Sequence, residues 1–588
     1  MWCDTPFVLL DDARSDGADA RLYRAPLEIV RADTADAVAA ALKALDAAQA
    51  RGLCAAGYVA YEAGHALEPK LPVPHSGTGP LLWFGLFEEF ETIPAADVPK
   101  HLPDPKGAWI GRPVPASSRA DYAAAFARVH DWIEAGDIYQ ANLTIRAAVR
   151  VIGDPLAAYA AIRPRAAAGY GGVVWTGEDW FLSFSPELFV AVRDGEVIAR
   201  PMKGTTPRGA TPEADDAAKA ELASDPKQRA ENLMIVDLMR NDLTRIAAPG
   251  SVQVPELFRV ETYPTLHTMV STVRARLATG TSAGDLIAAT FPCGSVTGAP
   301  KIRAMEVIND VETQPRGIYT GSIGRIDADS GAAFNVAIRT LHLAHDADIA
   351  TIGLGSGVVA DSRAAQEWDE CLAKGAFLTR GQRRFDLVET MAFDPNDGIR
   401  LLERHLARMK TSADTFGFPF DRHAVRNELQ AATFRLRGPA RVRLLLSPQG
   451  HVAIGTAPLP VAPDGPVTIM IQPRQVAPRD FRLIHKTTDR SIYPREPQVF
   501  ETIYIDADGF LTEGSFSNLF VARNNMLVTP PLSRGILPGV LRAELIETGR
   551  AVEGDLTPAD LAGGFHIGNA LRGLVAAVTV ADRGPDDL

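Results

Sequence analysis

A carboxyl group and an amine are brought together by residues 185–205, SPELFVAVRDGEVIARPMKGT. Two apolar segments flank Asp194-Gly195, a pattern that predicts a β-hairpin. We expect a three-residue loop ending at Gly195, which places Glu187 and Lys203 on one face; a strict two-residue turn would place them on opposite faces. In a partly desolvated site the amine is a nucleophile and the carboxyl a general acid and base. The alternative for an isolated hairpin is a surface ion pair.

The PMKGT segment resembles the PIKGT motif of the chorismate-utilising enzymes, specifically the aminodeoxychorismate synthase component I subfamily. In that subfamily the lysine attacks chorismate, whereas anthranilate synthases carry alanine, so the resemblance implies that Lys203 is the nucleophile. It also implies that Glu187 protonates the departing hydroxyl and later accepts a proton from ammonia. Gln140 stands near a strand start, where water-using members carry a lysine base. Because a neutral amide cannot deprotonate water, Gln140 favours nitrogen addition.

Two predicted helices carry the acidic residues that a metal site needs. Asp225-Pro226 supplies an N-cap and a first-turn proline for ENLMIVDLMRNDL, whose apolar residues run most of the way round and predict a buried helix. Glu370 and Lys374 share a face of a second helix, which by itself is typical of a solvated charged stripe. The resemblance assigns Glu231 and Glu370 to magnesium, since carboxylates, water and a substrate carboxylate are ligands it accepts.

Further matches concern the substrate. The resemblance places His267 beside the enolpyruvyl side chain of chorismate, although a purely structural histidine is an equal alternative. The G-x-G-x-G in GLGSGVV differs from the dinucleotide fingerprint, so we reject a dinucleotide site. An arginine can hold a carboxylate with two hydrogen bonds, and glycines let backbone N–H groups approach a ligand. The resemblance implies substrate-binding roles for Gln140, Gly204, Thr205, Tyr319, Arg339, Gly355, Gly357 and Lys374.

The sequence after the basic GQRR segment belongs to a different kind of protein. FDLVETM, RLLERHLARM and ARVRLLLS read as strand, helix and strand, and TEGSFSN and GILPG follow further on. Together with IHKTTDR they resemble the fold type IV enzymes that use pyridoxal phosphate (PLP). The resemblance implies that Lys486 forms the Schiff base and moves protons, and that Glu513 faces the pyridine nitrogen. It assigns the phosphate to Arg408 and to the N–H groups of Ile536 and Leu537.

Two details favour a lyase over an aminotransferase in this half. KTTDR, from Lys486 to Arg490, resembles the K-x-x-N-R of aminodeoxychorismate lyases, and Thr390 stands where those lyases carry a threonine. Three alternatives remain open. They are an anthranilate synthase component I fused to an aminotransferase, a true aminotransferase in the C-terminal half, and a C-terminal docking module without catalysis.

The two resemblances together imply an α+β chain with two catalytic halves. Residues 1–378 are expected to form the chorismate-binding-enzyme fold, a large antiparallel β-sheet core with surrounding helices. Residues 379–384 are a linker, and 385–588 form a fold type IV PLP domain of two α/β subdomains. A chain of 588 residues is too long for one hydrophobic core, which agrees with this division.

Composition excludes several other classes of protein. The residues are 46% hydrophobic and 22% charged, as in ordinary soluble enzymes, and a net charge of −12 argues against nucleic-acid binding. The four scattered cysteines predict free thiols and no zinc site. We find no signal peptide and no membrane span, so we expect a cytoplasmic protein.

The two halves predict two consecutive reactions, in which the product of the first is the substrate of the second. Chorismate and ammonia give 4-amino-4-deoxychorismate in the first half; the second half expels pyruvate from it and leaves 4-aminobenzoate, a folate precursor. The chain has no G-x-C-x-G nucleophile of a glutamine amidotransferase, so we expect a separate amidotransferase subunit to supply ammonia from glutamine. The resemblance to fold type IV enzymes also implies a homodimer through the C-terminal domain.

Overall fold

The computed structural model describes residues 5–71, 77, 79–263 and 266–580, and it divides into two compact units. Unit 1 comprises residues 1–102, 112–151 and 159–380. Unit 2 comprises residues 381–588 together with two segments from the first part of the chain, 103–111 and 152–158. Two short segments from the N-terminal half of the sequence therefore belong to the same compact unit as the C-terminal half.

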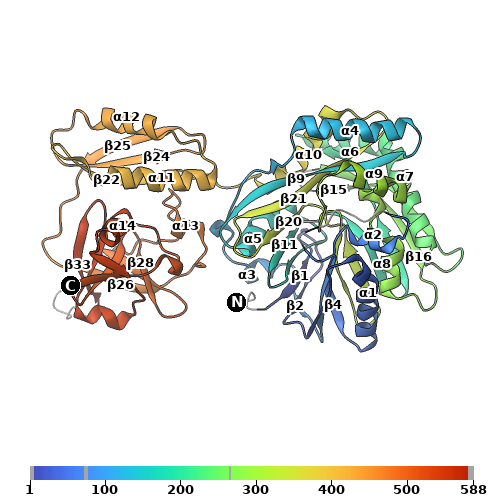
Figure 1. The fold of residues 1–588 in the computed structure, drawn as a ribbon, viewed down its shortest axis with the longest axis horizontal. Helices are drawn as coiled ribbons and strands as arrows, with labels where there is room; N and C mark the ends of the chain where they lie inside the picture. Colours follow the sequence, from blue (N-terminus) through green and yellow to red (C-terminus); the bar gives the residue numbers. More distant parts are fainter. Residues whose placement is uncertain (1–4, 72–76, 78, 264–265, 581–588) are drawn as a thin grey trace. The chain divides into compact units, whose positions relative to one another are not determined.

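Unit 1 is built on two large sheets whose strands pair antiparallel (Figure 1). The first sheet runs in the order β17 (Gly298–Ala299), β9 (Gln140–Ile152), β21 (Ile349–Val358), β20 (Thr340–Ala344), β11 (Asp179–Ser183), β10 (Gly171–Trp175), β1 (Phe7–Asp11), β2 (Ala20–Arg24) and β6 (Glu91–Ile93), and β8 (Val114–Pro115) pairs with β9. The second runs in the order β14 (Met202–Pro207), β16 (Leu266–Arg276), β13 (Glu196–Arg200), β12 (Leu188–Arg193), β19 (Ala332–Asn335), β18 (Ser322–Ile326), β4 (Cys54–Val59), β5 (Leu82–Phe87) and β3 (Glu28–Ala32), and β15 (Gln253–Thr262) pairs with β16. This arrangement confirms the predicted antiparallel core.

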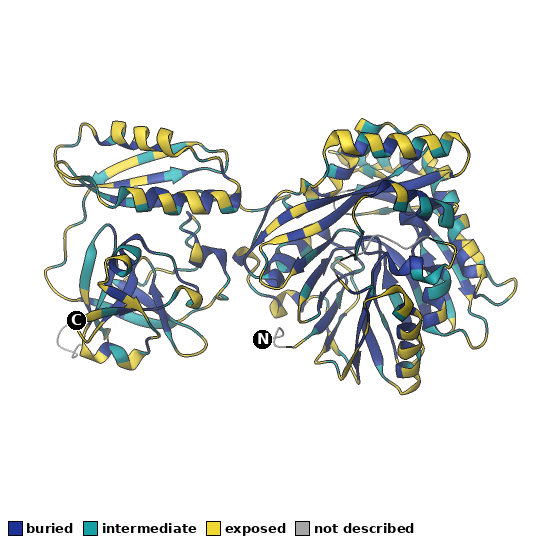
Figure 2. Ribbon diagram, in the orientation of Figure 1, coloured by how far each residue is buried: buried dark blue, intermediate teal, exposed yellow. Residues whose placement is uncertain are grey.

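Helices surround these sheets, and their outer faces are exposed while the strands are largely buried (Figure 2). The helices of the first 380 residues are α1 (Ala35–Ala50), α2 (Ala63–Leu67), α3 (Val98–His101), α4 (Arg119–Glu134), α5 (Pro155–Ala166), α6 (Pro212–Ser224), α7 (Pro226–Thr244), α8 (Ala283–Thr290), α9 (Lys301–Val311) and α10 (Ala364–Lys374). One core lies between the sheets, where Tyr58 and Trp83 of the second sheet meet Val8 and Phe181 of the first. Burying large aromatic side chains there contributes strongly to stability.

The helix that carries Glu231 begins as predicted but is not buried all round. The Asp225 side chain caps α7 by accepting hydrogen bonds from the N–H groups of Lys227 and Gln228. Ile235 and its neighbours on one face enter the core, whereas Leu233 is 43% exposed. The expectation of a fully buried helix was wrong, because α7 covers one side of the second sheet and leaves its opposite face to solvent.

Unit 2 contains two subdomains, as predicted. The smaller has the sheet order β23 (Gly398–Ile399), β22 (Leu387–Asp394), β24 (Ala440–Leu446) and β25 (Val452–Pro458), with α11 (Leu402–Phe416) and α12 (Arg422–Thr433). The larger has the order β28 (Leu511–Gly514), β27 (Glu501–Ile505), β26 (Val467–Pro473), β33 (Gly573–Thr579), β32 (Phe565–Asn569), β29 (Asn518–Arg523), β30 (Met526–Thr529) and β31 (Ala551–Glu553), with α13 (Phe481–Ile484) and α14 (Val540–Glu547). An additional β28–β29 pairing closes part of this sheet into a barrel.

The described residues bear on two further expectations. Cys54, Cys293 and Cys371 are buried free thiols, and Cys3 lies outside the described residues. None of the helices in the described ranges has the length and apolarity needed to cross a bilayer.

Candidate active sites

Unit 1 holds a cavity of about 330 Å³ that collects most of the predicted chorismate-site residues. Its wall comes from the start of β12, from β14 and α7, and from β21 and α10. Eleven side chains or backbones named from the sequence line it: Glu187, Lys203, Gly204, Thr205, Glu231, Tyr319, Arg339, Gly355, Gly357, Glu370 and Lys374. Residues as far apart in the chain as Asn142 and Lys374 therefore meet around one space.

The hairpin that carries Glu187 turns in two residues, so the expected three-residue loop was wrong. Arg193 pairs with Glu196, and both loop residues have positive φ, 52° and 73°. A β-bulge between Leu188 and Ala191 then shifts the register, so that Leu188 pairs with Arg200. The bulge inserts one residue into β12. It therefore returns Glu187 and Lys203 to the same face of the sheet, which a strict two-residue turn without a bulge would not allow.

Lys203 lies in β14, lines this cavity and is half-buried. Burial lowers the pKa of the Lys203 amine, and the nearby Glu231 carboxylate opposes that change. The amine lies against Gly357 of β21, because a Cβ built there would be 2.7 Å from Lys203 Nζ. Only glycine leaves this room, and an amine in such a site is neutral more often than one in water.

Gln140 begins β9 and lies on the same side of Gly357 as Lys203. Its residue is fully buried, and the same built Cβ would be 3.3 Å from Gln140 Nε2. Within the described part of the chain, neither heteroatom of the Gln140 amide has a hydrogen-bond partner. A buried amide with both groups unsatisfied is costly, so it is suited to a polar ligand.

Glu187 is 4% exposed, and among the described residues the Ser295 side chain donates a hydrogen bond to its carboxyl. Ser295 Oγ donates a hydrogen bond of 2.8 Å to Glu187 Oε1, and Cys293 Sγ lies 3.2 Å from Ser295 Oγ. Burial raises the pKa of Glu187 to about 7, against the Ser295 hydrogen bond and the Lys203 charge. Ser295 was not predicted as a site residue, although its stretch, FPCGSVTGAPK, offered a signal.

The two acidic residues assigned to magnesium lie on α7 and α10 and line the cavity together. Burial raises the pKa of Glu231. Glu370 forms an ion pair of 2.8 Å with Lys374, whose Nζ also donates to the Gly355 carbonyl at 2.8 Å. The described residues contain no cluster of three or more His, Cys, Asp or Glu side chains placed to hold a metal. Two carboxylates leave the remaining positions of a Mg²⁺ ion to water and substrate, which this ion accepts.

Arg339 and Tyr319 also line this cavity. Arg339 has a φ of 51°, and within the described residues its guanidinium makes no hydrogen bond or ion pair, although it lies 5.7 Å from the Phe377 ring centre. A Cβ at Gly353 would be 2.0 Å from the Tyr319 ring. The strand glycine therefore lets the phenol pack against backbone, and Arg339 remains available to a carboxylate.

His267 lies apart from this group. It belongs to β16 and does not line the cavity. Its Nε2 lies 2.9 Å from Asp215 Oδ1 and its Nδ1 lies 2.9 Å from Thr262 Oγ1. Both ring nitrogens are engaged within the fold, which is the arrangement of a structural histidine.

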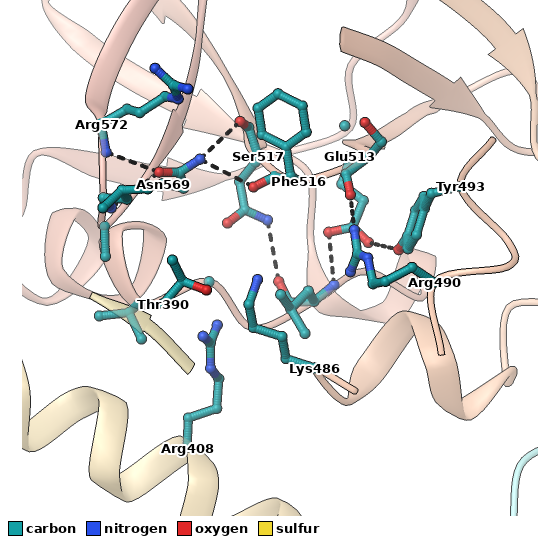
Figure 3. Close-up of a pocket in the computed structure, with 18 of the residues that line it drawn as sticks. Thr390, Arg408, Lys486, Arg490, Tyr493, Glu513, Phe516, Ser517, Asn569 and Arg572 are labelled. Atoms are coloured by element: carbon teal, nitrogen blue, oxygen red, sulfur yellow. Dashed lines mark hydrogen bonds between the residues drawn. The ribbon is translucent and has the colours of Figure 1, made fainter. Parts of the chain in front are cut away.

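Unit 2 has its own cavity, of about 270 Å³, around Lys486 (Figure 3). Arg408, Glu513 and Leu537 line it with Lys486, and so does Thr390. Ile536 is buried next to Leu537 without reaching the cavity wall. The cavity thus brings together residues from both subdomains.

Lys486 and Glu513 have pKa values shifted towards neutrality by burial. Burial, followed by the charges of Arg408 and Arg490, lowers the pKa of Lys486 to about 8. Burial raises the pKa of Glu513 to about 7, although Tyr493 Oη donates to Glu513 Oε1 at 2.8 Å (Figure 3). The Leu537 N–H donates to the other carboxylate oxygen at 3.0 Å. The amide assigned to phosphate is therefore directed at Glu513.

Arg408 is oriented by a carboxylate that was not predicted as a site residue. Its Nε and Nη2 donate to the two oxygens of Glu389 at 2.8 and 2.6 Å, and its Nη1 donates to the Pro538 carbonyl. Burial opposes ionisation of Glu389, but the Arg408 charge and the His405 hydrogen bond outweigh it and hold its pKa at about 2. No local pattern in VETM distinguishes this glutamate from a strand-surface residue.

The residues around this cavity suit PLP. A half-buried amine with a lowered pKa can react with the cofactor aldehyde, and a guanidinium fixed by Glu389 offers its remaining N–H groups to phosphate. The buried His405 Nε2 has no hydrogen-bond partner within the described residues, and His405 lines the cavity. An unsatisfied donor or acceptor at this place is expected where a polar group binds.

Comparisons with known proteins assign each half to a family. The model of chorismate binding enzymes matches residues 6–380, and that of class IV amino-transferases matches residues 386–580. Over 262 residues, the chain is 45% identical to aminodeoxychorismate synthase component 1 of Klebsiella aerogenes, covering 44% of this chain and 56% of that protein. It is 42% identical to an anthranilate synthase component 1 of Haloarcula marismortui over 46% of this chain and 56% of that protein.

The chain thus spans about half the length of the curated relatives it matches. Among solved structures, anthranilate synthase component I from Streptococcus pneumoniae TIGR4 superposes with a TM-score of 0.53 at 26% identity, covering 64% of this chain and 93% of that one. The class IV amino-transferase match implies PLP chemistry for residues 386–580. The chorismate binding enzyme model matches well over half of the 588 residues, and the chain therefore belongs to the chorismate-binding enzyme family.

Proposed function

We propose that unit 1 catalyses amination of chorismate at the para position, giving 4-amino-4-deoxychorismate. The observation that carries this proposal is the amine of half-buried Lys203, which lies against Gly357 in the same cavity as Glu187. Lys203 displaces the ring hydroxyl, and Glu187, whose pKa of about 7 keeps it partly protonated at neutral pH, gives that hydroxyl a proton. Ammonia then displaces Lys203, and Glu187 accepts a proton from it.

Substrate and metal positions follow from the other groups that line the cavity and from Gln140, which does not line it but lies next to Gly357, which does. Arg339 holds a chorismate carboxylate, and Glu231 and Glu370 hold Mg²⁺, which neutralises another carboxylate. The buried Gln140 amide orients the incoming nitrogen by hydrogen bonding and cannot activate water. The unsatisfied amide and the unpaired guanidinium of the described structure support this division of roles.

The ammonia is proposed to come from a separate glutamine amidotransferase. A relative 45% identical over 44% of the chain is named as component 1 of its synthase, which supports a second component for this protein. Free ammonium at high pH is expected to replace that component, because a high pH raises the concentration of neutral ammonia.

We propose that unit 2 then eliminates pyruvate from the aminated product and releases 4-aminobenzoate. Lys486, Glu513 and Arg408 would hold PLP, which when bound withdraws electrons from the carbon that loses a proton. Lys486, with a pKa of about 8, takes the ring proton and returns it to the departing enolpyruvyl group. Thr390 lines the cavity, which supports the lyase over an aminotransferase because lyases resembling this domain carry a threonine there.

The test is incubation of the pure chain with chorismate, Mg²⁺, ammonium and PLP. We expect para-aminobenzoate and one pyruvate for each chorismate consumed. Pyruvate-free accumulation of the aminated intermediate would support unit 1 and reject the lyase, whereas no chorismate turnover would reject the synthase.

A second candidate is ortho amination, as in an anthranilate synthase. The 42% identity to an anthranilate synthase component 1 favours it. The lysine at position 203 opposes it, because anthranilate synthases resembling this chain carry alanine there. Chromatography of the aromatic product separates the two, since the ortho isomer would support this candidate.

A further inference from the structure

The cavity of unit 2 has more positive charge than PLP binding uses. Six lysine and arginine side chains line it among the described residues, against one acidic side chain, Glu513. The overall net charge of the chain is −12, so this excess is a local feature of the cavity. A pocket lined by one sign of charge concentrates ligands of the opposite sign.

Four of these six cations already have partners or a role. Arg408 is held by Glu389, and Arg482 Nε donates to Asp480 at 2.9 Å. Arg490 donates to the Ser515 carbonyl and lies 4.2 Å from the Tyr493 ring centre. The fourth is Lys486, whose amine reacts with the cofactor.

The other two, Arg441 and Arg572, have no such partner. Within the described residues, neither guanidinium makes a hydrogen bond or an ion pair, and Arg572 has only the Phe500 ring at 5.5 Å. Arg441 belongs to β24 of the smaller subdomain, whereas Arg572 lies in the turn between β32 and β33 of the larger one. Arg572 lies beside Asn569, away from Arg408 (Figure 3).

We propose that Arg441 and Arg572 each hold one carboxylate of the substrate, so that this cavity selects amines with two carboxylates. The inference rests on the proposed lyase function, whose substrate carries one carboxylate on the ring and one on the enolpyruvyl group. A guanidinium matches a carboxylate with two parallel N–H groups. An aliphatic amino acid offers only one carboxylate and leaves the second arginine unpaired. The partly exposed Phe516 ring at the same cavity provides an apolar surface for the cyclohexadiene.

Binding of two small anions tests the proposal without turnover. The probes are 3-(carboxymethoxy)benzoate, with two carboxylates spaced as in the substrate, and 3-methoxybenzoate, with one. Calorimetry on the PLP-loaded full chain is expected to give at least ten-fold tighter binding of the dianion. Arg441→Gln and Arg572→Gln should each reduce that preference to about three-fold or less. Equal affinities in the parent, or a preference kept by both variants, would overturn the proposal.

Arg437→Gln is the matched control, because Arg437 is an exposed arginine that precedes β24 and does not line the cavity. It removes the same charge and should keep the preference for the dianion. A loss of preference in this control would mean that overall charge, and not the two cavity arginines, decides binding, which overturns the assignment.

Steady-state kinetics distinguish failure of this inference from failure of the lyase function. With 4-amino-4-deoxychorismate, both cavity variants should raise KM at least ten-fold, change kcat by less than about three-fold and take up PLP like the parent. Pyruvate release with an unchanged KM in both variants would reject the carboxylate assignment and leave the lyase intact. Selective dianion binding without pyruvate release by the parent would reject the lyase alone.

Discussion

Lys203 and Gln140 approach the same point of the backbone, the Cα of Gly357. A Cβ at that position would be 2.7 Å from Lys203 Nζ and 3.3 Å from Gln140 Nε2. The amine proposed to attack chorismate and the amide proposed to orient ammonia are therefore neighbours. Both can lie this close to β21 because residue 357 is a glycine and has no side chain. This relationship gives the first test of the site.

Gly357→Ala should displace the Lys203 amine with little effect on the fold. The nearest atom is the end of a flexible side chain, which can move away, so we expect a melting temperature within about 3 °C of the parent. Chorismate amination should fall at least about ten-fold, because a small displacement of a reacting group is costly. Gly455→Ala is the control, since nothing lies within 4 Å of the added methyl. Unchanged amination in Gly357→Ala would contradict the placement of Lys203.

Lys203→Ala should remove para-aminobenzoate formation almost completely. Loss of a covalent nucleophile typically costs about 1,000-fold or more in kcat. Chorismate binding, measured by calorimetry in the presence of Mg²⁺, should change little, because Arg339 and the metal site remain. A variant that makes para-aminobenzoate at the parental rate would rule out the proposed nucleophile.

Ser295→Ala should shift the pH dependence of amination. The Ser295 hydroxyl stabilises the ionised form of Glu187, whose pKa burial raises to about 7. Removing this donor destabilises the carboxylate, so its pKa rises further. The alkaline limb of the kcat/KM profile, where Glu187 loses its proton, should move to higher pH. A limb that stays in place or moves to lower pH would exclude Glu187 as the general acid.

Glu231→Gln should weaken the binding of the magnesium that the first reaction requires. The substitution removes one of the two carboxylates expected to bind the ion, and we expect the Mg²⁺ concentration for half-maximal activity to rise about ten-fold or more. Lys203 should keep its reactivity, because its pKa is lowered mainly by burial. Glu306→Gln, a substitution on α9 outside the cavity lining, is the control. An unaltered Mg²⁺ dependence in Glu231→Gln would remove this residue from the metal site.

The uptake of PLP should depend on the protonation of Lys486. Burial lowers the pKa of this amine to about 8, and only the neutral form attacks an aldehyde. The rate of uptake should therefore rise with pH and level off above about pH 8. Borohydride reduction followed by peptide mass analysis should place the cofactor on Lys486. Labelling of another lysine, or none, would support the alternative of a non-catalytic module.

The resemblance to the two families implied the antiparallel sheet core of unit 1 and the two subdomains of unit 2, and sequence patterns predicted the N-cap of α7, which depends on local capping chemistry. They did not predict the two-residue turn with its compensating bulge, since the bulge between Leu188 and Ala191 depends on pairing with neighbouring strands. They also overestimated the burial of α7, because an apolar residue such as Leu233 does not reveal which face meets a sheet.

The sequence by itself determined which chemical groups are available: a lysine at position 203, a glutamine at position 140 and a second lysine, Lys486, in a different kind of domain. Only the tertiary structure decided their protonation and their partners. Burial lowers the pKa of both lysines, and Ser295 and Glu389 reach their carboxyl and guanidinium partners across 108 and 19 residues of chain. The physical reason is that desolvation and hydrogen bonding depend on every element packed around a group, and no stretch of sequence contains those elements.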